Sequence, residues 1–301
     1  MDSVDKKILN TLRSNCRVQY QEIANDLNLS LNAVKGRVKK LVESGVIVEL
    51  GVWLHWTVIN AGYAFILANF NADFDIDFLS AKLEENPMTM RYGFTATNTG
   101  LIRVEYQGLG KLSEYATSLR KLEGVESIEV HPVNVGSGKL YEFSTSELRV
   151  LKCLKEDPRM PVSRISERTE ISSKKISDMI QHWQEEHIIQ FSADWNLNAA
   201  GSTSFYLKVD FDEKVTERKN LDDYMKEKYP IEYWGSLNSS IQPLFLAVFM
   251  VDHIRDTETI SRDMKSQNGV LESHIVIPYP DRNLPGLCGS ILDKMLEEIH
   301  C

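Results

Sequence analysis

Long apolar runs are missing from this sequence of 301 residues. A membrane-spanning helix needs roughly 18 or more consecutive apolar residues, and no stretch comes near that length. Residues 1–5 lack the basic and apolar segments of a secretion signal. Cysteine is also scarce: the four residues show no CxxC spacing and no histidine partners at metal-ligand spacing, which argues against a zinc site or a disulfide framework. We therefore expect a cytoplasmic protein with reduced thiols and with neither a metal nor a cofactor.

An excess of basic residues is missing too, since the formal net charge is −9. An acidic balance at first argues against a nucleic-acid partner. That objection does not hold where positive charge is concentrated on one element, because affinity for DNA depends on local neutralisation of phosphates. The distribution of lysine and arginine along the chain therefore matters more than their total.

What the sequence does contain is an internal repeat. It matches itself without a gap at an offset of 142 residues. The matching pairs include Leu9 with Leu151, Leu12 with Leu154, Arg17 with Arg159, Ile23 with Ile165, Ser30 with Ser172, and Ile47 with Ile189. Such a repeat indicates the same fold twice, and residues 135–138 (Val-Gly-Ser-Gly) form the expected hinge between the copies.

Each copy opens with apolar stripes at helical spacing. In the first copy these stripes cover residues 4–12, 20–27 and 34–41. Ser30 is a good N-cap for the third helix, and Gly45 ends it. Two β-rich runs, residues 46–50 and 52–58, are joined at Gly51 and predict a hairpin. Three short helices followed by a hairpin indicate a winged helix-turn-helix.

The pattern after the hairpin is a strand, a helix, two strands, a helix and a strand, over residues 64–133 and again over residues 204–277. This βαββαβ order is typical of ferredoxin-like domains. We therefore predict an α+β fold of two tandem units. The expected domains are a winged helix-turn-helix DNA-binding domain at 1–58, a ferredoxin-like sensor or dimerisation domain at 59–138, a second winged helix-turn-helix at 139–200, and a second ferredoxin-like domain with a C-terminal helix (287–300) at 201–301.

The third helix of the first copy is the expected DNA-reading element, because the second helix of a helix-turn-helix lies in the major groove. Asparagine can pair with adenine, lysines reach phosphates or guanine, and small outward residues let the helix axis approach closely. The candidate DNA-binding residues are Ser30, Asn32, Ala33, Lys35, Gly36, Arg37, Lys39 and Lys40. Arg37 lies at the edge of the buried face, so a structural role is an open alternative for it.

The equivalent helix of the second copy is less basic. Between Ser172 and Glu186 it has two lysines against three acids. Lys174 and Lys175 are candidate DNA contacts, although this helix is also compatible with a purely structural role.

These residues resemble the Lrp/AsnC family of feast/famine regulators over roughly residues 4–60. The resemblance rests on Asp5-x-x-Ile8-Leu9-x-x-Leu12, Asn15-x-Arg17, Glu22-Ile23-Ala24, Leu29-Ser30-x-x-x-Val34-x-x-Arg37-Val38-x-x-Leu41 and Gly45-Val46-Ile47. It implies a transcriptional regulator that binds double-stranded DNA, dimerises through the βαββαβ domain and often senses a small-molecule effector. The Gly-x-x-Asp element usual before the third strand of the sensor is absent from both copies, which argues against an amino acid as that effector.

Two other functions fit the same architecture. Sirohaem decarboxylases share it, but they carry an arginine-rich stretch after the helix-turn-helix, and residues 50–56 here have no arginine. A lone histidine there, His55, is more often structural than catalytic. A protein-interaction scaffold with a vestigial DNA-binding domain is the other alternative. Because no catalytic set occurs at diagnostic spacing, we predict that the protein is not an enzyme.

A homodimer is expected from the sheet faces. A four-stranded sheet with helices on one side needs cover on the other side when that face is apolar. The residues expected to supply such a face are Phe65, Leu67, Phe70, Phe205 and Leu207. The sheets can cover each other within one chain or pair across two chains. We predict the second arrangement, because two chains would offer two basic reading helices.

Overall fold

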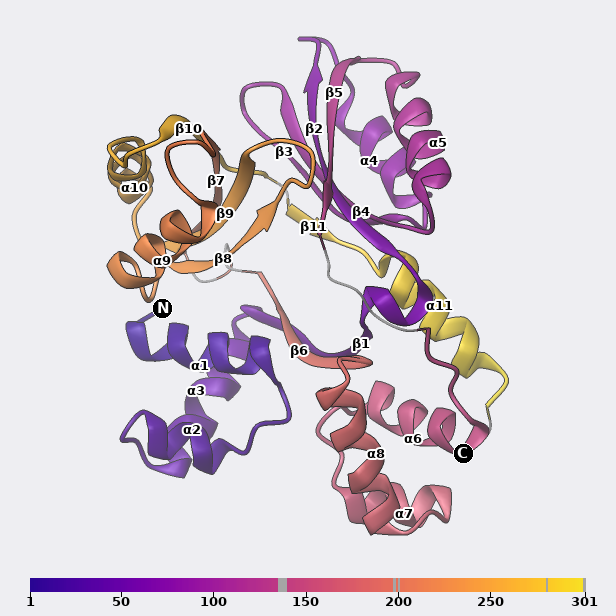
Figure 1. Ribbon diagram of the computed structural model, residues 1–301. Helices are drawn as coiled ribbons and strands as arrows, with labels where there is room; N and C mark the ends of the chain where they lie inside the picture. Colours follow the sequence, from indigo (N-terminus) through magenta and orange to yellow (C-terminus); the bar gives the residue numbers. More distant parts are fainter. Residues whose placement is uncertain (135–139, 197–198, 200, 280, 300–301) are drawn as a thin grey trace. The chain divides into compact units, whose positions relative to one another are not determined.

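The computed structural model describes residues 1–134, 140–196, 199, 201–279 and 281–299 (Figure 1). Its elements group into two units. The helix-turn-helix unit consists of residues 1–58, 140–202 and 291–301, and the sheet unit consists of residues 59–139 and 203–290. Both copies of the repeat therefore contribute to both units. The hinge expected at residues 135–138 lies outside the described residues.

Six helices and two strands make up most of the described helix-turn-helix unit. They are α1 (Ser3–Ser14), α2 (Tyr20–Asp26), α3 (Leu31–Glu43) and β1 (Ile47–Leu54) in the first copy, and α6 (Thr145–Glu156), α7 (Val162–Thr169), α8 (Ser173–Glu185) and β6 (Ile189–Trp195) in the second. Both copies begin with a capping box, Asp2 with Asp5 and Ser144 with Glu147, at equivalent positions. The three predicted helices of each copy are thus confirmed.

The turns on either side of α3 and α8 also repeat at the level of the backbone. Asn28 and Glu170, which are equivalent, have φ angles of 53° and 58° in the turn before the reading helix. Gly45 and His187, also equivalent, have φ angles of 72° and 52° just after it. Left-handed backbone favours glycine and asparagine. The second copy therefore keeps this geometry with less suitable residues.

The predicted wing hairpin is wrong. β1 continues through Gly51 as a single strand, and its antiparallel partner is β6 of the other copy, with Val52 opposite Phe191 and Leu54 opposite Ile189. A side chain at Gly51 would collide with the Trp53 indole, since a Cβ there would lie 2.5 Å from that ring. The absence of a side chain, which predicted a turn, instead makes room for Trp53 along a straight strand.

Two equivalent arginines link the copies reciprocally beside this two-stranded sheet. Arg17 donates to the carbonyl of Pro158, and Arg159 donates to the carbonyl of Cys16, the residue equivalent to Pro158. The Arg17 guanidinium lies 5.2 Å from the Phe191 ring centre, and that of Arg159 lies 4.1 Å from the Tyr20 ring centre. These exchanged contacts relate the two helix-turn-helix domains as two subunits of a symmetric dimer are related.

The sheet unit contains the two predicted ferredoxin-like domains. The first comprises β2 (Gly62–Phe70), α4 (Ile76–Glu84), β3 (Thr89–Phe94), β4 (Thr99–Tyr106), α5 (Leu109–Arg120) and β5 (Val125–Val133); the second comprises β7 (Thr203–Phe211), α9 (Arg218–Lys228), β8 (Tyr233–Asn238), β9 (Leu244–Val251), α10 (Arg255–Lys265) and β10 (Val270–Val276). The strand orders β5-β2-β4-β3 and β10-β7-β9-β8 are the same in both domains. The predicted α+β fold class is confirmed.

The faces of the two sheets opposite their helices pack against each other within the chain. Phe65 and Leu101 of the first sheet are buried together with Tyr206, Leu244 and Leu246 of the second. The prediction of which residues form this face was partly right. Phe65 and Leu67 belong to this cluster, whereas Phe70, Phe205 and Leu207 lie in the cores between each sheet and its helices. The face that led to the predicted homodimer is therefore already covered inside one chain.

The expected second ferredoxin-like domain with its C-terminal helix, at residues 201–301, includes a short strand that pairs with the first sheet instead. β11 (Asp281–Asn283) pairs with β3 and extends the first sheet to five strands. Arg91 of β3 binds Asp281 through two hydrogen bonds of 2.7 and 2.6 Å, which hold the added strand. The closing helix, α11, spans Gly286–Glu297, and Lys152 of α6 donates to the carbonyls of Leu296 and Ile299.

Candidate nucleic-acid interface

Helix α3 presents most of its predicted DNA-binding residues to solvent. Its inward residues Val34, Val38 and Leu41 are at most 5% exposed. The outward residues Asn32, Lys35, Gly36, Lys39 and Lys40 are exposed, and Ala33 is half-buried. This arrangement follows from a rotation of about 100° per residue. Apolar burial on one side thus places four polar or basic side chains and the open backbone of Gly36 on the other.

Local contacts fix the start and the spacing of this surface. The Ser30 hydroxyl accepts a hydrogen bond of 3.2 Å from the Ala33 amide and so caps the helix. A Cβ placed on Gly36 would meet no atom within 4 Å. The helix is therefore open at Gly36, where a partner can come close to the backbone.

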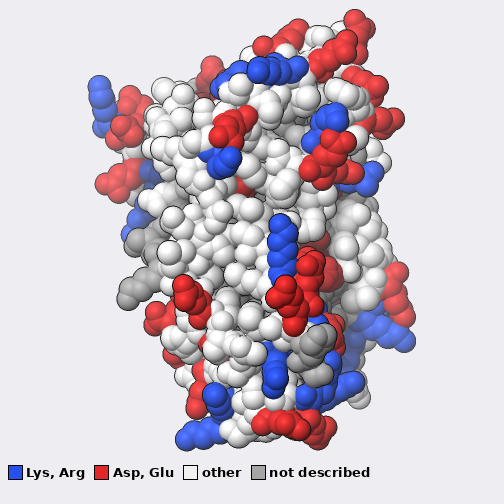
Figure 2. Space-filling view, turned by 90° about the vertical axis from the view of Figure 1, so that its right-hand side faces the viewer, with Lys and Arg blue, Asp and Glu red and all other residues white. Residues whose placement is uncertain are grey.

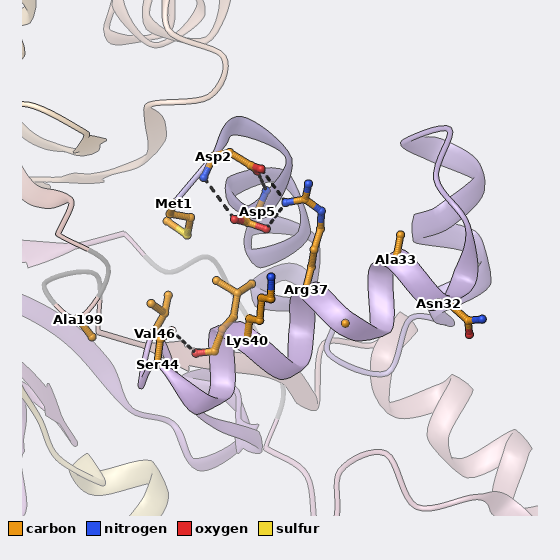
Figure 3. Close-up of a pocket in the computed structure, with 12 residues that line it drawn as sticks. Met1, Asp2, Asp5, Asn32, Ala33, Arg37, Lys40, Ser44, Val46 and Ala199 are labelled. Carbon is orange, nitrogen blue, oxygen red and sulfur yellow. Dashed lines mark hydrogen bonds and ion pairs between the residues drawn. The ribbon is translucent and has the colours of Figure 1, made fainter.

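Arg37 is bound within the protein. Its guanidinium donates hydrogen bonds of 2.7 Å to carboxylate oxygens of both Asp2 and Asp5 (Figure 3). These bonds raise the pKa of Arg37. Burial alone would raise the pKa of Asp2, but the Asp5 amide and the Arg37 guanidinium outweigh it and lower that pKa. Arg37 thus connects α3 to the start of α1, and two carboxylates neutralise its charge.

We predict that changing Arg37 to methionine, the residue at the equivalent position 179, leaves DNA binding nearly unchanged. The ion pairs are partly exposed, so their loss should cost about 1 kcal/mol or less of the free energy of unfolding. Urea denaturation and the salt dependence of DNA affinity measure the two effects. Lys40→Ala is the matched comparison and should lower the salt slope by about one unit. An equal drop in the Arg37→Met variant would show instead that Arg37 contacts a phosphate.

The outward lysines differ from Arg37 in their partners. Lys39 lies 3.6 Å from Glu43, but both side chains are more than 60% exposed, so this pair is weak. Lys35 and Lys40 form no ion pair within the described residues. α3 and the start of α1 border a hollow of about 700 Å³, with Lys40 on its wall and Asn32 pointing away from the acidic pair (Figure 3). Three lysines on this helix are therefore available to an anionic partner.

The second copy presents a different surface. Lys174 and Lys175 are exposed in the first turn of α8, and the Ser172 hydroxyl caps this helix through the Lys175 amide. Farther along, Gln181 is bound to Glu185 at 2.7 Å. The structure thus brings the predicted lysines to the surface at the start of α8, but acidic side chains accompany the rest of its outward face.

Two features of this region were missed from the sequence. Asp5 was used only as part of a motif, yet with Asp2 it binds Arg37. In the second copy the equivalent Glu147 instead accepts hydrogen bonds from Tyr141 and from the Trp183 indole. The repeat keeps an acid at both positions, but it does not reveal the partners, because Met179 replaces Arg37 and Trp183 corresponds to Leu41.

Not every surface of the molecule shows an excess of basic side chains like that on α3. On the face on the side of α5 and α11, Figure 2 shows basic and acidic side chains intermixed.

Within the described ranges no helix is long and apolar enough to cross a membrane. The same residues contain no group of three or more histidine, cysteine, aspartate or glutamate side chains placed to hold a metal ion.

Comparison with known proteins connects this surface to a family. The winged helix-turn-helix DNA-binding family matches residues 1–48 and 143–190, one segment in each copy. An uncharacterised HTH-type transcriptional regulator of Pyrococcus furiosus is 30% identical over 134 residues, which are 43% of this chain and 88% of that protein. The HTH-type transcriptional regulator LrpB of Bacillus subtilis is 25% identical over 122 residues, 40% of this chain and 82% of its own. These relatives have about the length of one copy.

A solved structure matches the whole tandem arrangement. The siroheme decarboxylase NirDL superposes with a TM-score of 0.60 at 11% identity, covering 98% of both chains. At that identity the likeness concerns the fold alone. The curated relatives match a length of about one copy, and the helix-turn-helix match occurs twice. This chain therefore belongs to the Lrp/AsnC family, in a tandem-duplicated form.

Proposed function

We propose that this protein is a sequence-specific transcriptional regulator that binds double-stranded DNA, mainly through α3 of its first winged helix-turn-helix. The observation that carries the proposal is the outward face of α3, where three lysines, an asparagine and an open glycine stand on a helix whose other side is buried. The HTH-type regulators among its relatives support the same function.

Each exposed residue of α3 has a role in this proposal. Asn32, in the first turn, is placed to pair with adenine in the major groove. Lys35, Lys39 and Lys40 neutralise phosphates or reach guanine. Ala33 and Gly36 keep the helix axis close to the bases. Ser30 holds the first turn in place through its cap.

Selection of bound sequences from random duplex DNA, with the purified full chain, tests this function. A regulator of this type should enrich a defined sequence motif. A protein-interaction scaffold with a vestigial DNA-binding domain would enrich none. Failure to enrich any motif across a range of salt concentrations would overturn the proposal, because non-specific electrostatic binding weakens as salt rises and could not hide a sequence preference throughout that range.

A sirohaem decarboxylase is the second candidate, because its structure superposes over the full length of this chain. The stretch that would bind the tetrapyrrole carboxylates is here part of β1, with Val52 and Leu54 buried in the pairing with β6. His55 lies at the end of that strand, and its Nδ1 is 2.8 Å from the Thr57 hydroxyl. Burial, together with the charge of His187, lowers the pKa of His55. These contacts favour a structural role for His55.

We expect no decarboxylation of sirohaem by this protein. The stretch from Leu50 to Trp56 offers no arginine for the substrate carboxylates. Anaerobic incubation with sirohaem, followed by mass spectrometry of the tetrapyrrole, measures the outcome. Loss of carboxyl groups above a heat-inactivated control would refute the regulator-only assignment.

The remaining partners follow from the same proposal. The protein would act in the compartment that holds DNA, in keeping with the cytoplasmic location expected from the sequence. A small-molecule effector stays a prediction taken from the family resemblance. The homodimer also stays a prediction, although the apolar sheet faces from which it was inferred cover each other within one chain.

A further inference from the structure

The two helix-turn-helix domains of one chain are held together as a pair. β1 and β6 share an antiparallel ladder in which Gly51 lies opposite Ser192. The Arg17 and Arg159 guanidinium groups cross between the copies to equivalent carbonyls. The Ser192 hydroxyl donates a further hydrogen bond of 2.6 Å to the Arg13 carbonyl. α3 and α8 therefore belong to one compact unit, in which the reciprocal arginine contacts relate the two copies as in a two-fold dimer.

The two reading helices offer different chemistry to DNA. Gly36 of α3 is replaced by Asp178 in α8, and the lysines at 35 and 39 are replaced by Ser177 and Gln181. Gln181 is occupied by Glu185. The positive charges of α8 are confined to Lys174 and Lys175, in the first turn. A carboxylate at the position of Gly36 would face the bases or phosphates that α3 approaches closely, so α8 cannot read DNA in the same way.

We propose that a single chain binds a non-palindromic duplex site with both helix-turn-helix domains at once. α3 reads base edges in one half-site. α8 lies against the neighbouring half-site, about one helical turn of DNA or a multiple of it away, and contacts only phosphates through Lys174 and Lys175. This inference rests on the proposed DNA-binding function and adds to it the class of DNA that is bound. Phosphate contacts fix position without specifying sequence, so only the first half-site carries sequence information.

Binding to three duplexes tests the inference: the selected site, the same site with its second half scrambled, and the site with its second half removed. Scrambling should change affinity less than about threefold. Removal should weaken binding about tenfold or more and lower the salt slope by about two units, one for each phosphate that Lys174 and Lys175 would neutralise. On the intact site, the Lys174→Ala/Lys175→Ala variant should bind as weakly as the wild type binds the shortened site. On the shortened site, the variant and the wild type should bind equally.

The controls separate this inference from the function on which it rests. Lys214→Ala/Lys219→Ala removes the same charge from exposed positions of the sheet unit and should bind like the wild type. Light scattering should give one 34.4 kDa chain per duplex. Two chains per duplex, equal losses on scrambling either half, or no loss on removal would each overturn the single-chain mode while leaving DNA binding intact. Absence of binding to every duplex would overturn the proposed function itself.

Discussion

Replacing Lys35, Lys39 and Lys40 by alanine should weaken DNA binding about a hundredfold at physiological salt. All three side chains are exposed on α3, and each charged contact with a phosphate contributes about 1 kcal/mol or more. The slope of log affinity against log salt should fall by about three units, since each phosphate contact accounts for about 0.9. Fluorescence anisotropy on a labelled duplex at several salt concentrations measures both quantities.

Two comparison variants make this result specific to α3. Alanine at Lys174 and Lys175 should reduce the slope by no more than about two units. Alanine at Lys121, Lys214 and Lys219 removes three exposed charges from the sheet unit and should leave the slope nearly unchanged. If all three variants lost affinity equally, binding would depend on overall charge, and α3 would not be the reading helix.

Changing Phe65 to alanine should lower the free energy of unfolding by about 3–5 kcal/mol, the usual cost of deleting a buried phenylalanine. Phe65 is fully buried between the two sheets, where its ring stacks on His131 with centres 4.8 Å apart. Leu271→Ala on β10 is the control in the same unit, because that side chain is 60% exposed and should cost less than about 0.5 kcal/mol. Urea denaturation measures both variants.

The same denaturation experiment shows whether one chain or two cover the sheet faces. If the cover is within the chain, the urea midpoint of the wild type should not change with protein concentration. A second chain bound to these faces would raise the midpoint as concentration increases, by mass action. A destabilisation below about 1 kcal/mol in Phe65→Ala, or a concentration dependence of the wild-type midpoint that this variant removes, would contradict the packing of the sheets within one chain.

The fold was largely predictable because its signals are local. The helical stripes, the Ser30 cap and the βαββαβ order can each be recognised from the spacing of residues within one short segment. The partner of a strand is not local. Glycine is common in turns, so Gly51 predicted one. Only the pairing of β1 with β6 shows that the strand continues through it. The three-residue strand β11 is too short to produce a periodic pattern, so its place beside β3 could not be predicted.

The candidate site was predictable to the same extent. The inward positions Val34, Val38 and Leu41 fix the outward ones by helical geometry alone. The partners of Arg37 could not be found in that way, since Asp2 and Asp5 lie at the start of another helix, 35 and 32 residues earlier in the sequence. The repeat does not reveal them either: methionine stands at position 179, so the second copy does without this cation.

The specificity ratio of the purified chain measures the central claim most directly. Affinity is determined at one salt concentration for the selected duplex and for a duplex of the same composition in scrambled order. A sequence-specific regulator should bind the selected duplex at least about a thousandfold more tightly. Equal affinity for the two duplexes would contradict the proposed function, because it would leave only non-specific attraction between the lysines of α3 and the phosphates.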